Sequence, residues 1–131
     1  MSAEHVSVAK RMYDARNRGD IEAVLAECDP EVEWHPHLAT LSGKPIRGHT
    51  GVRDYMGSLK EDWELFRHEP EEFFDFGEKV VAFLHTVAQG KSSGIDVEVP
   101  VGHVLSFRKG KIRRFVSYHD RGEALMAAQE K

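Results

Sequence analysis

Residues 97–120 read VEVPVGHVLSFRKGKIRRFVSYHD, and this stretch predicts two strands joined by a tight turn. Side chains in a strand alternate between two faces, so every second residue from Val97 shares one face. That face carries Val97, Val99, Val101, His103, Leu105 and Phe107. The pair Lys109-Gly110 is typical of a two-residue hairpin turn. The stretch therefore predicts a β-hairpin whose apolar face is interrupted by one residue, His103.

The register of this hairpin decides which side chains of the second strand lie on the same face as His103. Without a bulge, Val116 lies opposite His103. The shared face is then continued by the polar residues Arg114, Tyr118 and Asp120. A bulge shifts the second strand by one residue and presents a different set. That alternative set is Phe115, Ser117 and His119. We favour the unbulged register, and the sequence leaves both open.

The composition is that of a single globular domain spanning residues 1–131. Of the 131 residues, 40% are hydrophobic and 31% are charged, which suffices for a core without disulfides. Acidic residues outnumber basic ones by 22 to 18, so nothing attracts the chain generally to nucleic acid or to an anionic membrane. No stretch approaches the roughly 20 apolar residues that span a bilayer. With Cys28 as its only cysteine and no signal peptide at the start, the chain is expected to be cytoplasmic.

Three helices are predicted before the hairpin. Residues 2–18 have apolar side chains at helical spacing, and Gly19 then ends the helix. Asp20 can cap a second helix, which should end near residues 28–30 because the residue before a proline avoids helical geometry. Residues 50–66 carry the clearest amphipathic pattern of the chain, so we predict a third helix there.

The remaining segments predict strands, a loop and a short last helix. Residues 31–37, EVEWHPH, alternate like a strand. Residues 38–49 are rich in Gly, Ser and Pro and predict a loop, and loops of this length often border a binding site. Residues 69–76 and 79–89 predict two strands turning at Gly77-Glu78. In the second of these, Val81, Phe83, His85 and Val87 share one face. Residues 123–129 predict the short C-terminal helix.

Four segments of the chain resemble the SnoaL-like branch of the NTF2-like superfamily, to which the ketosteroid isomerases also belong. They are MYDARNRGDIEAVL (12–25), VEWHP (32–36), RGHTGVRDYM (47–56) and FRKGKIRRFVSYHDRGEALMAA (107–128). The resemblance covers nearly the whole chain. It implies an α+β fold, a cone-shaped barrel with three helices on a curved antiparallel sheet and a short C-terminal helix. It also implies one apolar cavity, often in a homodimer, that binds or transforms hydrophobic small molecules without cofactors.

The resemblance can be carried to individual positions. Ketosteroid isomerases use a tyrosine in the first helix, an aspartate base on the first strand and a protonated acid on a later strand. By this resemblance, Met12 corresponds approximately to the position of the tyrosine, with Tyr13 adjacent to it. Trp34 corresponds to the position of the aspartate base, and His103 to that of the protonated acid. Tryptophan cannot abstract a proton, so steroid isomerisation by that mechanism is disfavoured. SnoaL-like cyclases place an aspartate base near the end of the last strand, where this chain has Asp120.

The candidate catalytic residues are His103, Asp120 and Tyr118. Imidazole is the usual general acid or base near neutral pH, although a lone histidine in an apolar strand also occurs as a satisfied core residue. Asp120 equally suits a helix cap, because Asp-Arg-Gly-Glu resembles a capping box. A buried Arg114 would need Asp120 or Glu33 as a partner. The candidate ligand-binding residues are Trp34, His35, Tyr55, Trp63, His85 and Arg114.

The motifs of other chemistries are weak or missing from the sequence. His35 and His37 form an H-x-H pair that suits a metal, but no glutamate follows at cupin spacing, so we expect neither metal nor cofactor. No glycine-rich phosphate motif and no G-x-S-x-G motif occurs.

Two classes of function remain. The first is a cavity that binds a hydrophobic, cyclic small molecule, with cofactor-independent acid/base chemistry of isomerase, cyclase or epoxide-hydrolase type. The second is a non-catalytic ligand-binding or dimerisation protein. We expect a homodimer through an outer sheet face carrying Val80, Leu84 and Val104.

Overall fold

A computed structural model of the chain describes residues 2–36, 45–91 and 96–129. Within these ranges the chain forms four helices and six strands. In chain order they are α1 (Ser2–Asn17), α2 (Ile21–Ala26), β1 (Cys28–His35), β2 (Ile46–Arg47), α3 (Gly48–Asp62), β3 (Trp63–Asp75), β4 (Lys79–Gly90), β5 (Asp96–Arg108), β6 (Lys111–Tyr118) and α4 (Arg121–Gln129). None of the helices in these ranges has both the length and the apolar character needed to cross a membrane.

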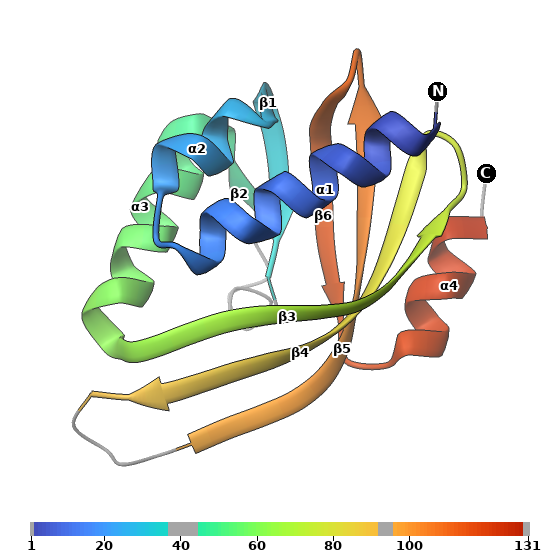
Figure 1. Cartoon of the computed structure of the whole chain (residues 1–131). Helices are drawn as coiled ribbons and strands as arrows, with labels where there is room; N and C mark the ends of the chain where they lie inside the picture. Colours follow the sequence, from blue (N-terminus) through green and yellow to red (C-terminus); the bar gives the residue numbers. More distant parts are fainter. Residues whose placement is uncertain (1, 37–44, 92–95, 130–131) are drawn as a thin grey trace.

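The described strands form one curved sheet in the order β2-β1-β6-β5-β4-β3. Figure 1 shows β3, β4 and β5 as long bent strands that curve under the first helix. Neighbouring strands run antiparallel except β1 and β6, which are parallel. The strands β2 and β3 form the two edges of the sheet. The α+β fold and the curved sheet are confirmed, with two corrections: the sheet is open rather than a closed barrel, and one of its pairings is parallel.

Helices cover both faces of the sheet (Figure 1). On one face, α1 and α3 pack over the strands and enclose the main core, which includes Met12, Val52, Leu84 and Leu105. Asp20 caps α2 as predicted, because its Oδ1 atom accepts a hydrogen bond from the backbone N–H of Ala23 at 3.1 Å. We call the face under α1 and α3 the inner face and the opposite one the outer face.

The last helix, α4, lies on the outer face, where Val81 and Val104 pack against Ala124. Gly102 permits this close approach, since a Cβ atom at that position would lie only 2.7 Å from the Cβ of Ala124. The predicted dimer surface therefore has to be corrected. Val80 and Leu84 belong to the inner core, and Val104 is covered by the chain's own helix; homodimerisation itself stays a prediction.

The hairpin between β5 and β6 has the predicted turn but not the predicted register. Lys109 and Gly110 both have positive φ, 53° and 78°, as a type I′ turn requires. Phe107 pairs with Ile112, but the next pair along joins Ser106 to Arg114. Arg113 is thus an extra residue, a β-bulge that turns the rest of β6 over. The unbulged register is wrong, and the bulged alternative is the one observed.

The bulge changes which side chains share a face with His103. Ser117 lies opposite His103, and Phe115 lies opposite Leu105. Tyr118 and Arg114 consequently point to the outer face. The same alternation applies on β4, where His103 pairs with Ala82. The row that contains His85 therefore faces outward, while Thr86 and Ala88 face inward with His103.

Several predicted boundaries also differ from the structure. The third helix ends at Asp62, and Trp63 has the extended geometry of a strand (φ −121°, ψ 131°). Trp63 and Phe66 therefore belong to β3, as the preference of aromatic residues for strands allows. The first strand begins at Cys28 rather than Glu31. Residues 46–49 form β2 and the start of α3 instead of a loop, and residues 38–44 of that predicted loop lie outside the described residues.

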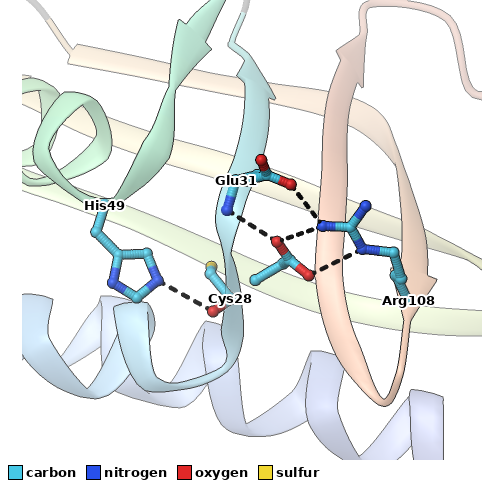
Figure 2. A network of polar contacts seen from close by, with 5 residues as sticks. Cys28, Glu31, His49 and Arg108 are labelled. Carbon is cyan, nitrogen blue, oxygen red and sulfur yellow. Dashed lines mark hydrogen bonds and ion pairs between the residues drawn. The ribbon is translucent and has the colours of Figure 1, made fainter.

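A polar network ties the start of β1 to the hairpin (Figure 2). The guanidinium of Arg108 donates two hydrogen bonds to the carboxylate of Asp29, at 3.1 and 2.9 Å, and one to Glu31 at 2.9 Å. This contact holds the pKa of Asp29 below its usual value. His49, at the start of α3, donates to the backbone carbonyl of Cys28 at 3.0 Å. Burial raises the pKa of the Cys28 thiol to about 12, so this cysteine is an unreactive part of the core.

Candidate functional site

A cavity of about 280 Å³ lies on the inner face, between α1, α3 and the sheet. Most of its wall is aromatic or aliphatic: Tyr55, Trp63, Phe66, Ala88, Val97, Val99, Val101 and Phe115. The polar groups in the wall are Arg16, His68, Thr86, His103, Ser117 and His119. Such a mostly apolar pocket with a few convergent polar groups is the usual form of a small-molecule site.

A smaller hollow of about 180 Å³ lies on the other side of Arg16, Trp63 and Phe66. It opens between the end of α1, α3 and the beginning of β3, and exposed side chains such as Lys60 and Arg67 form part of its wall. We regard the larger cavity as the candidate site, because it is more apolar and contains the histidines.

A buried hydrogen bond joins α1 to β5 at the cavity wall. The hydroxyl of Tyr13 lies 2.7 Å from Nδ1 of His103, and each residue is 1% exposed. Burial raises the pKa of Tyr13, so this side chain remains a neutral phenol. Because the bond is short and shielded from water, it holds the imidazole of His103 in one orientation.

Arg16 follows one helical turn after Tyr13 and lies on the same side of α1. Its guanidinium carbon stands 5.7 Å from the ring centre of Trp34 and 5.6 Å from that of Phe66. It also forms a hydrogen bond with the hydroxyl of Tyr55. Its Nη1 atom is buried without a hydrogen-bond partner among the described residues. Burial lowers the pKa of Arg16, but a guanidinium stays charged at any physiological pH.

A second buried histidine, His68 on β3, stands beside His103. The two ring centres are 5.0 Å apart, and Nδ1 of His68 lies 2.9 Å from the hydroxyl oxygen of Thr86. Burial, together with the nearby charge of Arg16, holds the pKa of His68 well below its usual value. His68 is therefore neutral at neutral pH, and it contributes a hydrogen-bonding group rather than a charge.

Three of the predicted site residues lie in the cavity wall, namely Tyr55, Trp63 and His103. Trp34 is fully buried next to it and stacks on Phe115, with ring centres 4.0 Å apart and planes inclined by 10°. Trp34 therefore supports the wall from behind. The roles assigned to these residues stay predictions.

The other predicted residues do not converge with His103. On the outer face, His85 is paired with Glu71, and Tyr118 packs in the small cluster under α4. His35 lies 3.2 Å from Glu33, also on the outer face. Their direction follows from strand alternation, because Ala82 and Ser117, the partners of His103, point inward. The prediction that these side chains share one pocket is wrong.

Arg114 and Asp120 are also outside the cavity. Arg114 is exposed and lies 3.8 Å from Glu33, which was one of its two expected partners. Asp120 caps α4: its Oδ1 accepts hydrogen bonds from the backbone N–H groups of Gly122 at 2.6 Å and Glu123 at 3.2 Å. Of the two roles that the sequence left open for Asp120, the structure shows the cap.

Sequence reasoning did not select Arg16 and His68 of the cavity wall, or Tyr13, which bonds His103 of that wall. Tyr13 and Arg16 lie at helical spacing with the apolar residues of α1, so a charged group within that apolar stripe was the available signal. His68 carried no such signal, because the predicted third helix and the following strand left it between two elements. Only the observed start of β3 at Trp63 places His68 on the inner face.

No group of three or more His, Cys, Asp or Glu residues suited to a metal ion occurs in the part of the chain that the structure describes. His37, one half of the H-x-H pair, lies outside that part.

Comparison with known proteins identifies the family to which this fold belongs. Residues 9–115 match the sequence profile of the SnoaL-like domain. No curated protein matches the chain. An NTF2-like protein of unknown function from Burkholderia pseudomallei is 24% identical, with a TM-score of 0.79 and coverage of 97% of this chain and 98% of that one.

Two further solved structures have the same fold. TerC, co-crystallized with polyporic acid, is 23% identical, with a TM-score of 0.78 and coverage of 97% of this chain and 99% of that one. A protein of Xanthomonas campestris pv. campestris, provisionally named a polyketide cyclase, is 20% identical, with a TM-score of 0.71 and 98% coverage of both chains. At these identities the likeness shows the fold alone.

Proposed function

The chain belongs to the SnoaL-like domain family, and we propose that it binds a hydrophobic ring compound in the inner cavity and transfers a proton on it through His103 without a cofactor. One observation carries this proposal. In a wall made mostly of apolar side chains, His103 is held by a 2.7 Å hydrogen bond to the phenol of Tyr13.

The size of the cavity supports a ligand of about two fused rings. An engineered cavity of about 150 Å³ lined by apolar side chains binds benzene. The present cavity, at about 280 Å³, has somewhat less than twice that volume. Flat walls formed by Trp63, Phe66 and Phe115 suit a planar ring system, because aromatic rings pack well against one another in offset or edge-to-face geometry.

The proton-transfer part of the proposal rests on the chemistry of His103. Imidazole can both accept and donate a proton near neutral pH, and a positioned general acid or base contributes about 10²–10⁴-fold to a reaction rate. Tyr13 serves as a positioning residue, since it bonds one ring nitrogen. The naming of one structural neighbour as a polyketide cyclase, and the crystallisation of another with polyporic acid, agree with a ring compound as ligand.

The test uses 2-tetralone, a two-ring ketone whose C1 protons exchange with solvent when a base removes them. Binding is measured by isothermal titration calorimetry, and exchange of C1–H for deuterium by NMR in D₂O. We expect the protein to bind 2-tetralone and to accelerate the exchange over buffer. His103→Gln should keep the affinity within a few-fold but lose at least about 10²-fold of the acceleration.

Asp120→Asn is the matched control, because its carboxylate caps α4 and is not part of the cavity wall, and an amide caps a helix about as well. This variant should exchange C1–H at the rate of the unaltered protein. Binding without acceleration would identify a non-catalytic ligand-binding protein, the second class left by the sequence. Failure to bind 2-tetralone or other two-ring compounds would refute the proposal. The homodimer and the cytoplasmic location stay predictions beside it.

A further inference from the structure

Arg16 is a permanent positive charge in the wall of a mostly apolar cavity. It lines the cavity together with Tyr55, Trp63 and Phe66. A charge in such surroundings is costly unless an opposite charge or several hydrogen bonds compensate it. The partners of Arg16 therefore decide whether the protein alone satisfies this group.

The described residues satisfy Arg16 only in part. The rings of Trp34 and Phe66 approach its guanidinium at 5.7 and 5.6 Å, and such contacts stabilise the charge through the faces of the rings. The N–H groups lie in the plane of the guanidinium and still need acceptors. Tyr55 provides one, while Nη1 is buried with no partner among the described residues.

No negative group of the described chain balances Arg16. None of the Asp and Glu residues described by the structure forms an ion pair with it, in contrast to Arg11, Arg18 and Arg53 on the outside of the molecule. The tyrosines around it do not supply an anion either, because burial raises the pKa values of Tyr13 and Tyr55 and keeps both phenols protonated. His68 next to it is held neutral. Among the described residues, the charge of Arg16 in the cavity wall is thus unbalanced.

We infer that the ligand is a planar ring compound that carries an anionic oxygen, as a carboxylate or an acidic enol, and that Arg16 pairs with this oxygen. The inference rests on the proposed function, since it names the class of molecule that the same cavity takes. The flat hydrocarbon part contacts Trp63 and Phe115, and the oxygen supplies the acceptor and the charge that Arg16 lacks. Guanidinium suits this task because its fork of N–H groups matches a carboxylate.

A matched pair of probes tests the charge without altering the protein. 2-Naphthoate and 2-naphthamide have the same two rings and almost the same shape, but only the first is an anion at pH 7.5. Isothermal titration calorimetry should show 2-naphthoate binding about 10- to 100-fold more tightly, the range expected for hydrogen bonds to a charged group. Equal affinities, or tighter binding of the amide, would overturn the inference.

Substitutions then show whether Arg16 causes the preference. Arg16→Met keeps most of the side-chain length and removes the charge, so it should abolish the preference for 2-naphthoate and leave the affinity for 2-naphthamide within a few-fold. Arg16→Lys keeps the positive charge but lacks the planar set of N–H donors of a guanidinium, so it should retain part of the preference for 2-naphthoate. This second variant keeps the inference testable if Arg16→Met does not fold. Arg18→Met removes a neighbouring but exposed arginine and should leave the preference intact.

The outcomes separate this inference from the proposed function. A preference that survives in Arg16→Met would overturn the role of Arg16 while leaving the cavity as a ring-binding site. Binding of 2-naphthamide but not of 2-naphthoate would refute the anionic ligand class and support a neutral one. Failure of both probes to bind would overturn the cavity as a site for two-ring ligands and the inference with it.

Discussion

Replacing Tyr13 by phenylalanine removes the hydroxyl that bonds His103 and leaves the ring in place. Tyr13 and His103 are each only 1% exposed, and the hydroxyl oxygen of Tyr13 lies 2.7 Å from Nδ1 of His103. Water therefore does not screen this hydrogen bond in the folded protein. Removing one partner of a buried hydrogen bond costs about 1–3 kcal/mol, because the other partner loses its bond without regaining water. We therefore expect Tyr13→Phe to lower the free energy of unfolding by about 2 kcal/mol.

Urea unfolding followed by circular dichroism measures this loss. For a domain of this size, about 2 kcal/mol corresponds to a fall in melting temperature of roughly 6–10 °C, so a thermal scan gives an independent check. Tyr118→Phe is the control, since it removes a half-buried hydroxyl on the outer face. The control should change the free energy of unfolding by no more than about 0.5 kcal/mol.

A double-mutant cycle with His103→Leu isolates the hydrogen bond from the packing of the two rings. His103→Leu also removes the contact between the rings of His103 and Phe115, whose centres are 4.4 Å apart. This loss is the same whether residue 13 is tyrosine or phenylalanine, so it cancels in the cycle. We expect the double variant to be less destabilised than the sum of the single variants by about 1–2 kcal/mol. A coupling energy within about 0.3 kcal/mol of zero would refute the reasoning.

Two further predictions concern the fold around the site. The pKa of His68 is lowered in the folded protein from the ordinary histidine value of 6.5. Below pH 6.5 the unfolded chain therefore binds more protons than the folded one, and the free energy of unfolding should fall as the pH drops. The slope should be up to about 1.4 kcal/mol per pH unit and smaller in His68→Gln, as urea unfolding at pH 7.5, 6.5 and 5.5 would show; identical slopes would contradict it. Gly102→Ala should destabilise by about 1–3 kcal/mol, because the added methyl would meet Ala124 at 2.7 Å. Thermal unfolding checks this, and an Ala124→Gly background should reduce the loss; unchanged stability of Gly102→Ala would contradict the close packing of α4.

Local sequence patterns predicted most of the helices and strands, though not all of their boundaries. Strand alternation grouped His103 with the inward row of β5, and the turn at Lys109-Gly110 was recognised from its glycine. Asp20 was identified as a helix cap from its position after Gly19. These features depend on residues close together in the chain, so they follow from backbone preferences and from the period of the side chains.

The same patterns could not show which face of each strand is the inner one. Alternation correctly grouped His85 with Val81, but it contains no information on which side of the sheet α1 lies. The bulge at Arg113 likewise moves the following side chains of β6 to the opposite face of the sheet, and the local sequence contains no pattern that predicts it. A strand shifted by one residue keeps its alternation while all its side chains change sides, and this is why Tyr118 was assigned to the wrong face.

The site itself was decided by contacts between distant parts of the chain. The family resemblance, the α+β fold and the place of His103 in an apolar row could all be inferred from residues close together in the chain. The packing of α1 on the sheet brings Tyr13 within hydrogen-bond distance of His103 on β5 and places Arg16 among Trp34, Tyr55 and Phe66. Such pairings follow from how α1 packs across the curved sheet, and no local periodicity records where two elements will cross.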